Sequence, residues 1–193
     1  MSTEHEVYVL LTDTGTLLTR TIKWFTKDPL NHASIAFDSQ LNEVYSFGRK
    51  KPNNPFFGGF VKENMRGELF GQAACAVYRC TVSGSALSEI RRQIVHMEQN
   101  HHQYKYNLIG MFGLLLNIEI DRQYAYFCSQ FVASVFENSG VHLVNKSSLL
   151  VKPADLIQNP RLKLVYQGDM LTYMQSVSAE CVDSSHQAAI RTA

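Results

Sequence analysis

The sequence predicts a mixed α+β domain in which an antiparallel sheet packs against helices. Two segments rich in small, β-branched or aromatic residues, 32–38 and 42–48, flank the short turn 39–41, which is the pattern of a hairpin. Farther along, apolar residues recur at helical spacing within the segments 87–97 and 131–136. Strands joined by a short turn, with helices elsewhere in the chain, favour this fold class.

The N-terminal part predicts one strand and one helix. Residues 6–12, "EVYVLLT", form a short apolar run that is typical of a buried strand, and "TDTG" follows as its turn. Apolar side chains then share one helical face over residues 16–26. Asp28 and Pro29 end that helix, because proline interrupts the helical hydrogen-bond pattern.

The longest loop candidate is residues 49–67, "RKKPNNPFFGGFVKENMRG", which is rich in Pro, Gly and Asn. Long loops in compact domains are often lids or binding loops, so we expect a functional loop here. The alternating residues 72–82 predict the next strand. Ser83 or Ser85 can then cap the helix that follows it.

The second half of the chain is predicted to be mainly helical. Residues 107–118 form an almost wholly apolar helix, and the next helix begins near Cys128 and stops at Gly140. Pro153 is suited to the first turn of a short helix. Residues 162–168 form the last predicted strand.

Length and composition predict one globular domain. The chain has 193 residues, of which 45% are hydrophobic and 18% are charged, and its formal net charge is +1. We expect residues 1–175 to form the domain, and the Ser- and Ala-rich residues 176–193 to form a flexible tail. Because the net charge is small and no basic stripe is present, nucleic acid is not an expected partner.

The sequence shows no membrane-spanning segment. Its longest apolar stretch, within residues 107–118, is about a dozen residues, which is too short to cross a bilayer. The first residues, "MSTEHEVYVLLTD", carry acidic groups and lack the layout of a signal peptide. We therefore expect a cytoplasmic protein, whose oligomeric state the sequence leaves open.

The four cysteines are Cys75, Cys80, Cys128 and Cys181. They lack the paired spacing of metal sites, so we expect neither a metal nor another cofactor. In a reducing compartment they are free thiols. Cys75 and Cys80 lie in a predicted strand and are expected to pack as small apolar residues.

Cys128 stands where a predicted helix begins. At that position the free backbone N–H groups and the helix dipole favour a thiolate over a thiol. The residue is therefore either a small buried side chain or a nucleophile.

A nucleophilic cysteine needs a base, and His32 is the candidate. It begins a strand on which Ser34 and Ala36 share its face, and these small neighbours leave the imidazole reachable. Ser46, in the neighbouring strand, is expected to hydrogen-bond the outer ring nitrogen of His32, because paired side chains on one face lie within roughly 5 Å. The alternatives are a hydrogen-bonded histidine at a strand start and an outward-facing polar serine.

The segments "HASIAFDS" and "YFCSQFV", with "YKYN" and an apolar helix before the cysteine, resemble the permuted papain-like enzymes of the NlpC superfamily, and most closely its YiiX-like branch. The resemblance covers residues 7–170. It implies a circularly permuted papain-like fold with the catalytic residues in the chain order His32, Ser46, Cys128. Members of the family often carry Glu, His, Asn or Gln where Ser46 stands.

The resemblance also implies a mechanism. The Cys128 thiolate attacks a carbonyl carbon, and His32 holds a proton and then delivers it to the leaving amine. The N–H of Cys128 stabilises the oxyanion, and a second donor is expected from the turn that contains Asp13 and Thr14. Asp13 could instead bind a substrate amine, or it could only form the turn.

Together these features predict a thiol hydrolase, a cysteine peptidase or amidase that cleaves an amide or isopeptide bond in a small peptide or cell-wall-type fragment. Two alternatives stay open. A thiol acyltransferase or lipid-directed hydrolase on the same fold would hold an acyl chain with the apolar residues 54–60 and 108–116. A catalytically silent binding protein is favoured by the serine at position 46.

Overall fold

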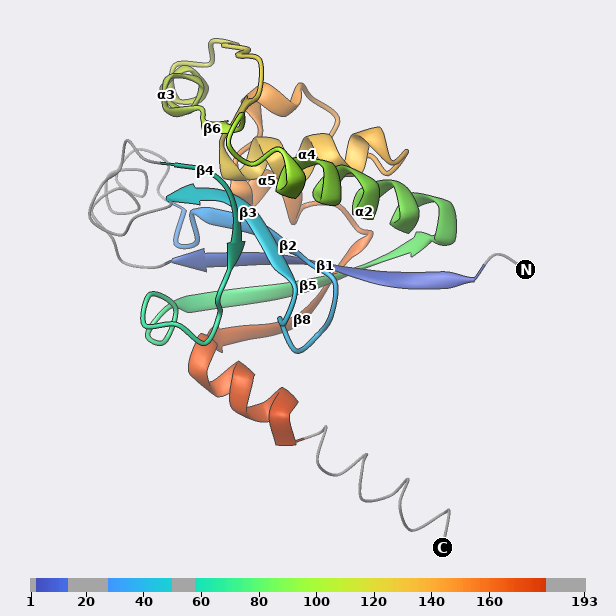
Figure 1. Cartoon of the computed structure of the whole chain (residues 1–193). Coiled ribbons are helices and arrows are strands. Elements are labelled where there is room, and N and C mark those ends of the chain that lie inside the picture. Colours follow the sequence, from blue (N-terminus) through green and yellow to red (C-terminus); the bar gives the residue numbers. More distant parts are fainter. Residues whose placement is uncertain (1–2, 14–27, 50–57, 180–193) are drawn as a thin grey trace, which may run out of the picture.

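The computed structural model describes residues 3–13, 28–49 and 58–179. Within these ranges the main sheet has six strands in the order β4-β3-β2-β1-β5-β8, and each strand is antiparallel to its neighbours (Figure 1). The strands are β1 (Glu4–Asp13), β2 (His32–Ala36), β3 (Val44–Arg49), β4 (Gly58–Glu63), β5 (Ala74–Ser83) and β8 (Leu162–Asp169). The predicted α+β class with an antiparallel sheet packed against helices is confirmed.

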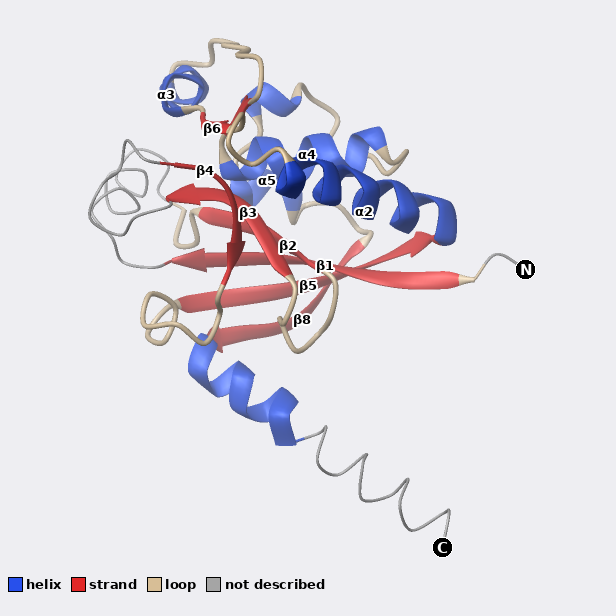
Figure 2. Ribbon diagram, viewed as in Figure 1, coloured by secondary structure: helices blue, strands red, loops and turns tan. Residues whose placement is uncertain are grey.

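Helices lie on both sides of this sheet (Figure 2). A parallel pair of two-residue strands forms a second, small sheet. The remaining elements are α2 (Gly84–Gln99), β6 (Lys105–Tyr106), α3 (Leu108–Leu115), β7 (Ala125–Tyr126), α4 (Cys128–Asn138), a 3-10 turn (Ser148–Leu150) and α5 (Pro153–Leu156). Residues 170–179, which follow β8, are also helical.

Strand alternation divides the core between the two faces of the sheet. In β1, Val7 and Val9 point into a cluster that contains the buried residues of α2 and α4. Tyr8 and Leu10 point into the other cluster, which the helical residues 170–179 complete. Because successive strand side chains face opposite ways, one strand supplies both cores.

Helix α2 begins, and helix α4 begins and ends, where the sequence predicted. The Ser83 side chain caps α2 by accepting a hydrogen bond from the N–H of Ala86 at 3.2 Å. Helix α4 begins at Cys128, and Gly140 follows it with a φ of +80°, a left-handed conformation that glycine adopts without steric cost.

The prediction of one long loop over residues 49–67 is wrong, because β4 lies inside it. In the register of β3 and β4, Phe47 is opposite Phe60. The Phe60 ring lies 5.9 Å from that of Phe47 and 6.0 Å from that of Phe131 in α4, measured between centroids. Burial of this aromatic side chain fixes the segment as a strand. The part of the expected binding loop at 50–57 lies outside the described residues.

Two other predicted segments lie wholly or partly outside the residues that the structure describes. The helix expected over residues 16–26 is not covered, and neither are residues 180–193 of the expected tail. Residues 176–179, also assigned to the tail, continue a helix whose Val177 is buried. Over the ranges given above, every helix is too short or too polar to cross a bilayer.

Residues 107–124 form an excursion that carries α3 and is closed at its base by the pairing of β6 with β7. The completely buried Asn107 holds both ends of this excursion. Its side-chain oxygen accepts from the N–H of Gly110 at 2.9 Å, which caps α3, and its side-chain nitrogen donates to the carbonyl of Ile120 at 3.2 Å. The excursion leads directly into Phe127 and Cys128.

Candidate active site

Cys128 is the first residue of α4, and its sulfur lies against the start of β2. The residue is only 6% exposed, and its Sγ is 4.0 Å from the carbonyl oxygen of Asn31. The backbone N–H groups of Ala33 and Ser129 donate to the thiolate. Helix α4 is held in place by Phe131 and Phe136, which are completely buried in the core between the sheet and the helices α2 and α4. The helix thus fixes the thiol at one end of the central strands.

His32 lies between Cys128 and a carboxylate. Its Nε2 is 2.7 Å from Oε1 of Glu63, at the end of β4, and both side chains are largely buried. The imidazole also hydrogen-bonds the Cys128 sulfur. Since Glu63 occupies Nε2, the nitrogen that faces the thiol is Nδ1. The three groups form a chain of thiol, imidazole and carboxylate, which is the arrangement that nucleophilic catalysis by cysteine requires.

Two buried serines hold the Glu63 carboxylate. Ser46 in β3 donates to Oε1 at 2.7 Å, and Ser34 in β2 donates to Oε2 at 2.6 Å. Burial alone would raise the pKa of Glu63, but the positive charge and hydrogen bond of His32 and the two hydroxyl donors lower it. The carboxylate therefore stays ionised and fixed in orientation.

The pKa values of the other two groups favour the charged forms. Burial would lower the pKa of His32, but the carboxylate of Glu63 and the neighbouring thiolate raise it to about 10. Burial would raise the pKa of the Cys128 thiol, but the hydrogen bond and charge of His32, together with the two backbone N–H donors, lower it. Each of the two groups therefore favours the charged form of the other, thiolate beside imidazolium.

Strands β2 and β3 are not paired at the start of β2, where the Cys128 sulfur lies. The N–H of Phe37 donates to Glu43, and the pairs between β2 and β3 end at Ile35. In an antiparallel ladder the N–H groups that face one neighbour alternate, so Ala33 is the next residue whose N–H faces β3. That N–H donates to the Cys128 sulfur instead. The N–H of Ala33, which has no partner in β3, thus binds the thiolate.

The structure places the predicted site residues as follows. It brings Cys128 and His32 together. Ser46 is in the same cluster but acts through Glu63, so the expected direct bond from Ser46 to His32 is replaced by a bond to the carboxylate that orients the ring. Asp13 ends β1, one residue beyond Thr12, which pairs with His32. Thr14 lies outside the described residues.

Glu63 was missed because its segment resembles a loop. The residues "NPFFGGFVKEN" contain Pro, Asn and Gly, and the apolar alternation is only a few residues long. One signal was present: Val61 and Glu63 stand two apart, so they share a face if the segment is a strand. In β4 that face is the one on which Ser46 lies, opposite Val61.

Replacing Ser46 or Ser34 with alanine is expected to destabilise the fold by roughly 1.5–3 kcal/mol at pH 7, because each hydroxyl bonds a buried charged group. Since the pKa of Glu63 is lowered in the fold, this contribution is present above the usual value of 4.5 and is lost as the pH falls through the folded value. Unfolding by urea at several pH values measures both effects.

Ser129→Ala is the matched control for these variants. Ser129 is equally buried, but its hydroxyl donates to the neutral carbonyl of Val151 at 2.6 Å. Its loss is expected to destabilise the fold by the same amount at every pH. Equal pH profiles for Ser46→Ala and Ser129→Ala would show that Ser46 does not act on a charged Glu63.

The other described cysteines lack this environment. Cys75 and Cys80 are free and buried, as predicted for small apolar residues. Burial raises the pKa of Cys75 to about 12, and it also raises that of Cys80. Cys181 lies outside the described residues. In the part of the chain that the structure covers, His, Cys, Asp and Glu side chains form no group of three or more suited to a metal ion.

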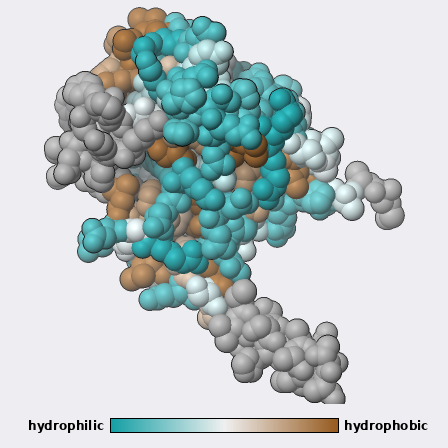
Figure 3. All heavy atoms as spheres, in the orientation of Figure 1, coloured by the Kyte–Doolittle hydropathy of each residue, from teal (hydrophilic) through white to brown (hydrophobic). Residues whose placement is uncertain are grey.

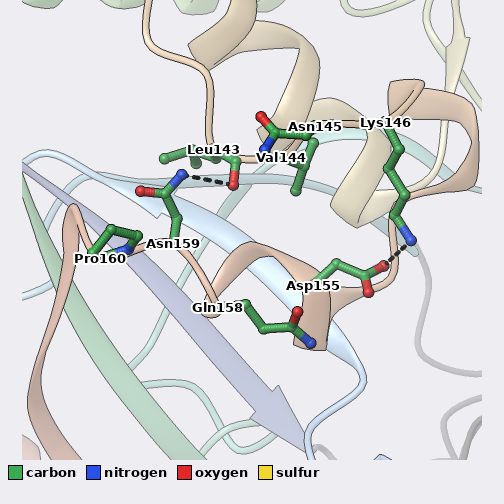
Figure 4. A pocket seen from close by; sticks show the side chains of 8 residues that line it. All are labelled: Leu143, Val144, Asn145, Lys146, Asp155, Gln158, Asn159 and Pro160. Carbon is green, nitrogen blue, oxygen red and sulfur yellow. Dashed lines mark hydrogen bonds and ion pairs between the residues drawn. The ribbon is translucent and has the colours of Figure 1, made fainter.

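A separate polar pocket of about 430 Å³ contains none of these residues (Figure 4). The side chain of Asn159 donates to the carbonyl of Leu143 at 3.0 Å, and Nζ of Lys146 is 2.7 Å from Asp155. These bonds join the chain after α4 to α5, which indicates a structural role. The lining residues are Leu143, Val144, Asn145, Lys146, Asp155, Gln158, Asn159 and Pro160.

No family model, no curated protein and no solved structure matches this chain. What the site can do therefore follows from its own geometry and from the chemistry of the residues that form it.

Proposed function

We propose that the protein is a thiol hydrolase that cleaves an amide or isopeptide bond through an acyl-enzyme intermediate on Cys128. The observation that carries this proposal is the buried chain of Cys128, His32 and Glu63, in which both partners of the imidazole favour its charged form. The order of these residues along the chain, His, Glu, Cys, is compatible with a permuted papain-like fold. A carboxylate in the third role also agrees with the residue types common in that family.

The first half of the reaction uses the ion pair directly. The Cys128 thiolate forms a C–S bond to the carbonyl carbon, and the carbonyl electron pair moves to oxygen. The N–H of Cys128, in the first turn of α4, has no partner within its helix and can donate to that oxyanion. As the C–N bond breaks, Nδ1 of His32 gives its proton to the leaving amine.

The second half regenerates the thiolate. His32, now neutral, takes a proton from water, and the resulting hydroxide attacks the thioester carbon. The C–S bond breaks, the acid product leaves and the thiolate returns beside an imidazolium. Glu63 keeps the imidazole oriented and stabilises its positive charge throughout.

The same acyl-enzyme supports an acyltransferase if an amine or alcohol replaces water. A catalytically silent protein is less well supported than the sequence implied, because Glu63 supplies the carboxylate that Ser46 alone could not.

The test is a library of small amide, isopeptide and ester substrates offered to the wild type and to Cys128→Ala. Hydrolysis by the wild type and none by Cys128→Ala is the expected result. Transfer to an added amine or alcohol, without net hydrolysis, would favour the acyltransferase. Turnover that survives in Cys128→Ala would overturn the assignment of the nucleophile.

Selective alkylation is expected to identify Cys128 without a known substrate. At pH 6 a thiol with the usual pKa of 9.0 is only about 0.1% ionised, whereas the lowered pKa of Cys128 leaves a larger fraction of this residue as the reactive thiolate. Iodoacetamide should therefore label Cys128 at least roughly 100-fold faster than Cys75 or Cys80. Peptide mapping over time measures these rates and that of Cys181. Equal labelling of Cys128 and Cys181 at this pH would contradict a lowered thiol pKa.

A further inference from the structure

The helix α3 exposes an apolar surface close to the candidate nucleophile. Four large side chains, which we call the α3 patch, are about half exposed or more: Ile109 (54%), Phe112 (48%), Leu116 (71%) and Ile118 (53%). Figure 3 shows this hydrophobic surface over α3 at the top of the molecule. The eight residues of α3, "LIGMFGLL", contain no charged or polar side chain. Leu116 and Ile118 directly follow α3, so the exposed apolar groups gather within ten consecutive residues (109–118), and such a gathering marks a surface that contacts something apolar.

The α3 patch is rigidly connected to the site. The opposite face of α3 places Met111 and Leu114 against Phe127, which immediately precedes Cys128. Asn107 and the pairing of β6 with β7 close the base of the excursion. Whatever the patch contacts is therefore held at a fixed position relative to the thiolate.

The dimensions of the patch favour lipid over protein. Helix α3 is about 12 Å long. Four side chains exposed to this degree offer roughly 400 Å² of apolar surface, about half of the ~800 Å² that each partner buries in a stable protein complex. Helix α3 itself also carries no polar side chain that could orient a protein partner by hydrogen bonds. At a bilayer surface the binding strength scales with the apolar area that inserts, so a patch of this size contributes in proportion to its area.

The charges beside the patch are balanced. Lys105, just before the excursion, and Arg122 within it are basic, whereas Glu119 and Asp121 within it are acidic. Contact with lipid through this surface therefore depends on apolar burial, and anionic headgroups contribute little to it.

We propose that the α3 patch docks into the interfacial region of a lipid bilayer and brings Cys128 to the membrane surface. Given the proposed hydrolase, on which this second step rests, the substrate is an amide carried by a lipid or a lipid-anchored chain. The thiolate then reaches a carbonyl near the headgroup level while α3 lies among the acyl chains.

Flotation with vesicles tests the docking independently of catalysis. The probes are vesicles of phosphatidylcholine and vesicles of phosphatidylcholine mixed equally with phosphatidylglycerol. The wild type and Cys128→Ala are expected to float equally with both, with little effect of salt. The double variant Phe112→Ser/Leu116→Ser should reduce the bound fraction at least roughly tenfold, because it removes two of the four side chains that insert.

The matched control is Leu164→Ser/Leu171→Ser. These two residues are exposed to 53% and 56% but lie on β8 and in residues 170–179, far from α3 in Figure 1. Full binding by this control and loss of binding in the α3 variant, with unchanged circular dichroism in both, is the expected outcome. Absence of wild-type binding, equal loss in both variants, or a dimer that only the α3 variant abolishes would each overturn membrane docking, and none of them bears on whether Cys128 is a nucleophile.

Discussion

His32→Ala is expected to lower kcat/KM for the hydrolysed substrate by about 10²–10⁴-fold, the usual contribution of general acid–base catalysis. Two functions are lost at once. Nδ1 no longer protonates the leaving amine, and the charge that holds the Cys128 thiol ionised is gone. The thiol pKa should then rise to its usual value or above, because burial becomes the dominant influence.

The pH dependence of alkylation separates these two functions. In the wild type, the Cys128 thiol should react with iodoacetamide from mildly acidic pH upward. In His32→Ala the same reaction should require pH values near or above 9, while turnover stays low even there, because no group delivers the proton. Added imidazole should restore part of the turnover by occupying the space that the side chain leaves.

His96→Ala is the control for the loss of an imidazole. His96 is exposed in the last turn of α2. Its replacement should change neither the alkylation profile nor turnover. If His32→Ala behaved in the same way, the imidazole would have no part in the reaction, and the proposed hydrolase would fail with it.

The main elements of the fold could be predicted from the sequence because local patterns determine them. The stripe after Cys128 predicted α4, and its Phe131 and Phe136 are buried in the core as that spacing implies. The alternation around Ser46 was also informative: Tyr45 and Phe47 face the helices, and Val44 faces the other core. Apolar residues that recur with a period of two in a strand, or of about 3.6 in a helix, identify the buried face of that element from the sequence alone.

The orienting carboxylate could not be predicted, because no local pattern defines β4. This strand depends on Phe60 packing against Phe47 and Phe131, residues that come from β3 and α4. Such a contact is tertiary, and the Gly- and Asn-rich sequence around it favours a loop when considered alone. Once the strand forms, its register brings Glu63 within reach of the face that carries Ser34 and Ser46.

The structure thus places Ser46 on the same face as His32, but its hydroxyl donates to Glu63 and not to the imidazole. Its expected role was to hold His32 through one neutral hydrogen bond. Its observed role is to hold a charged carboxylate, which raises the energetic importance of its hydroxyl. A serine that holds the carboxylate is hard to distinguish by sequence from one that would bond the imidazole directly, since both kinds of residue lie on the same face of neighbouring strands.

Glu63→Gln is expected to destabilise the fold by roughly 3–5 kcal/mol, because it removes one partner of a buried ion pair and leaves the His32 imidazolium uncompensated. The pKa of Glu63 is lowered in the fold, so its contribution is present above 4.5 and is lost in acid. The pKa of His32 is raised from 6.5 to about 10, so its contribution is complete below 6.5 and is lost as the pH rises through about 10. The difference between wild type and variant should therefore be largest between pH 4.5 and 6.5.

The same substitution is expected to reduce turnover at neutral pH by about 10²–10⁴-fold, since the amide can neither stabilise the imidazolium nor fix the tautomer of the ring. Glu43→Gln is the matched control: Glu43 pairs with Arg91 at 3.2 Å, but both side chains are exposed by 40% or more, so its loss should cost at most about 1 kcal/mol at any pH. Urea unfolding across pH, together with alkylation of Cys128, measures both effects. If Glu63→Gln left the alkylation profile unchanged, the thiolate would owe its stability to the backbone N–H groups of Ala33 and Ser129 and not to the imidazole that Glu63 orients.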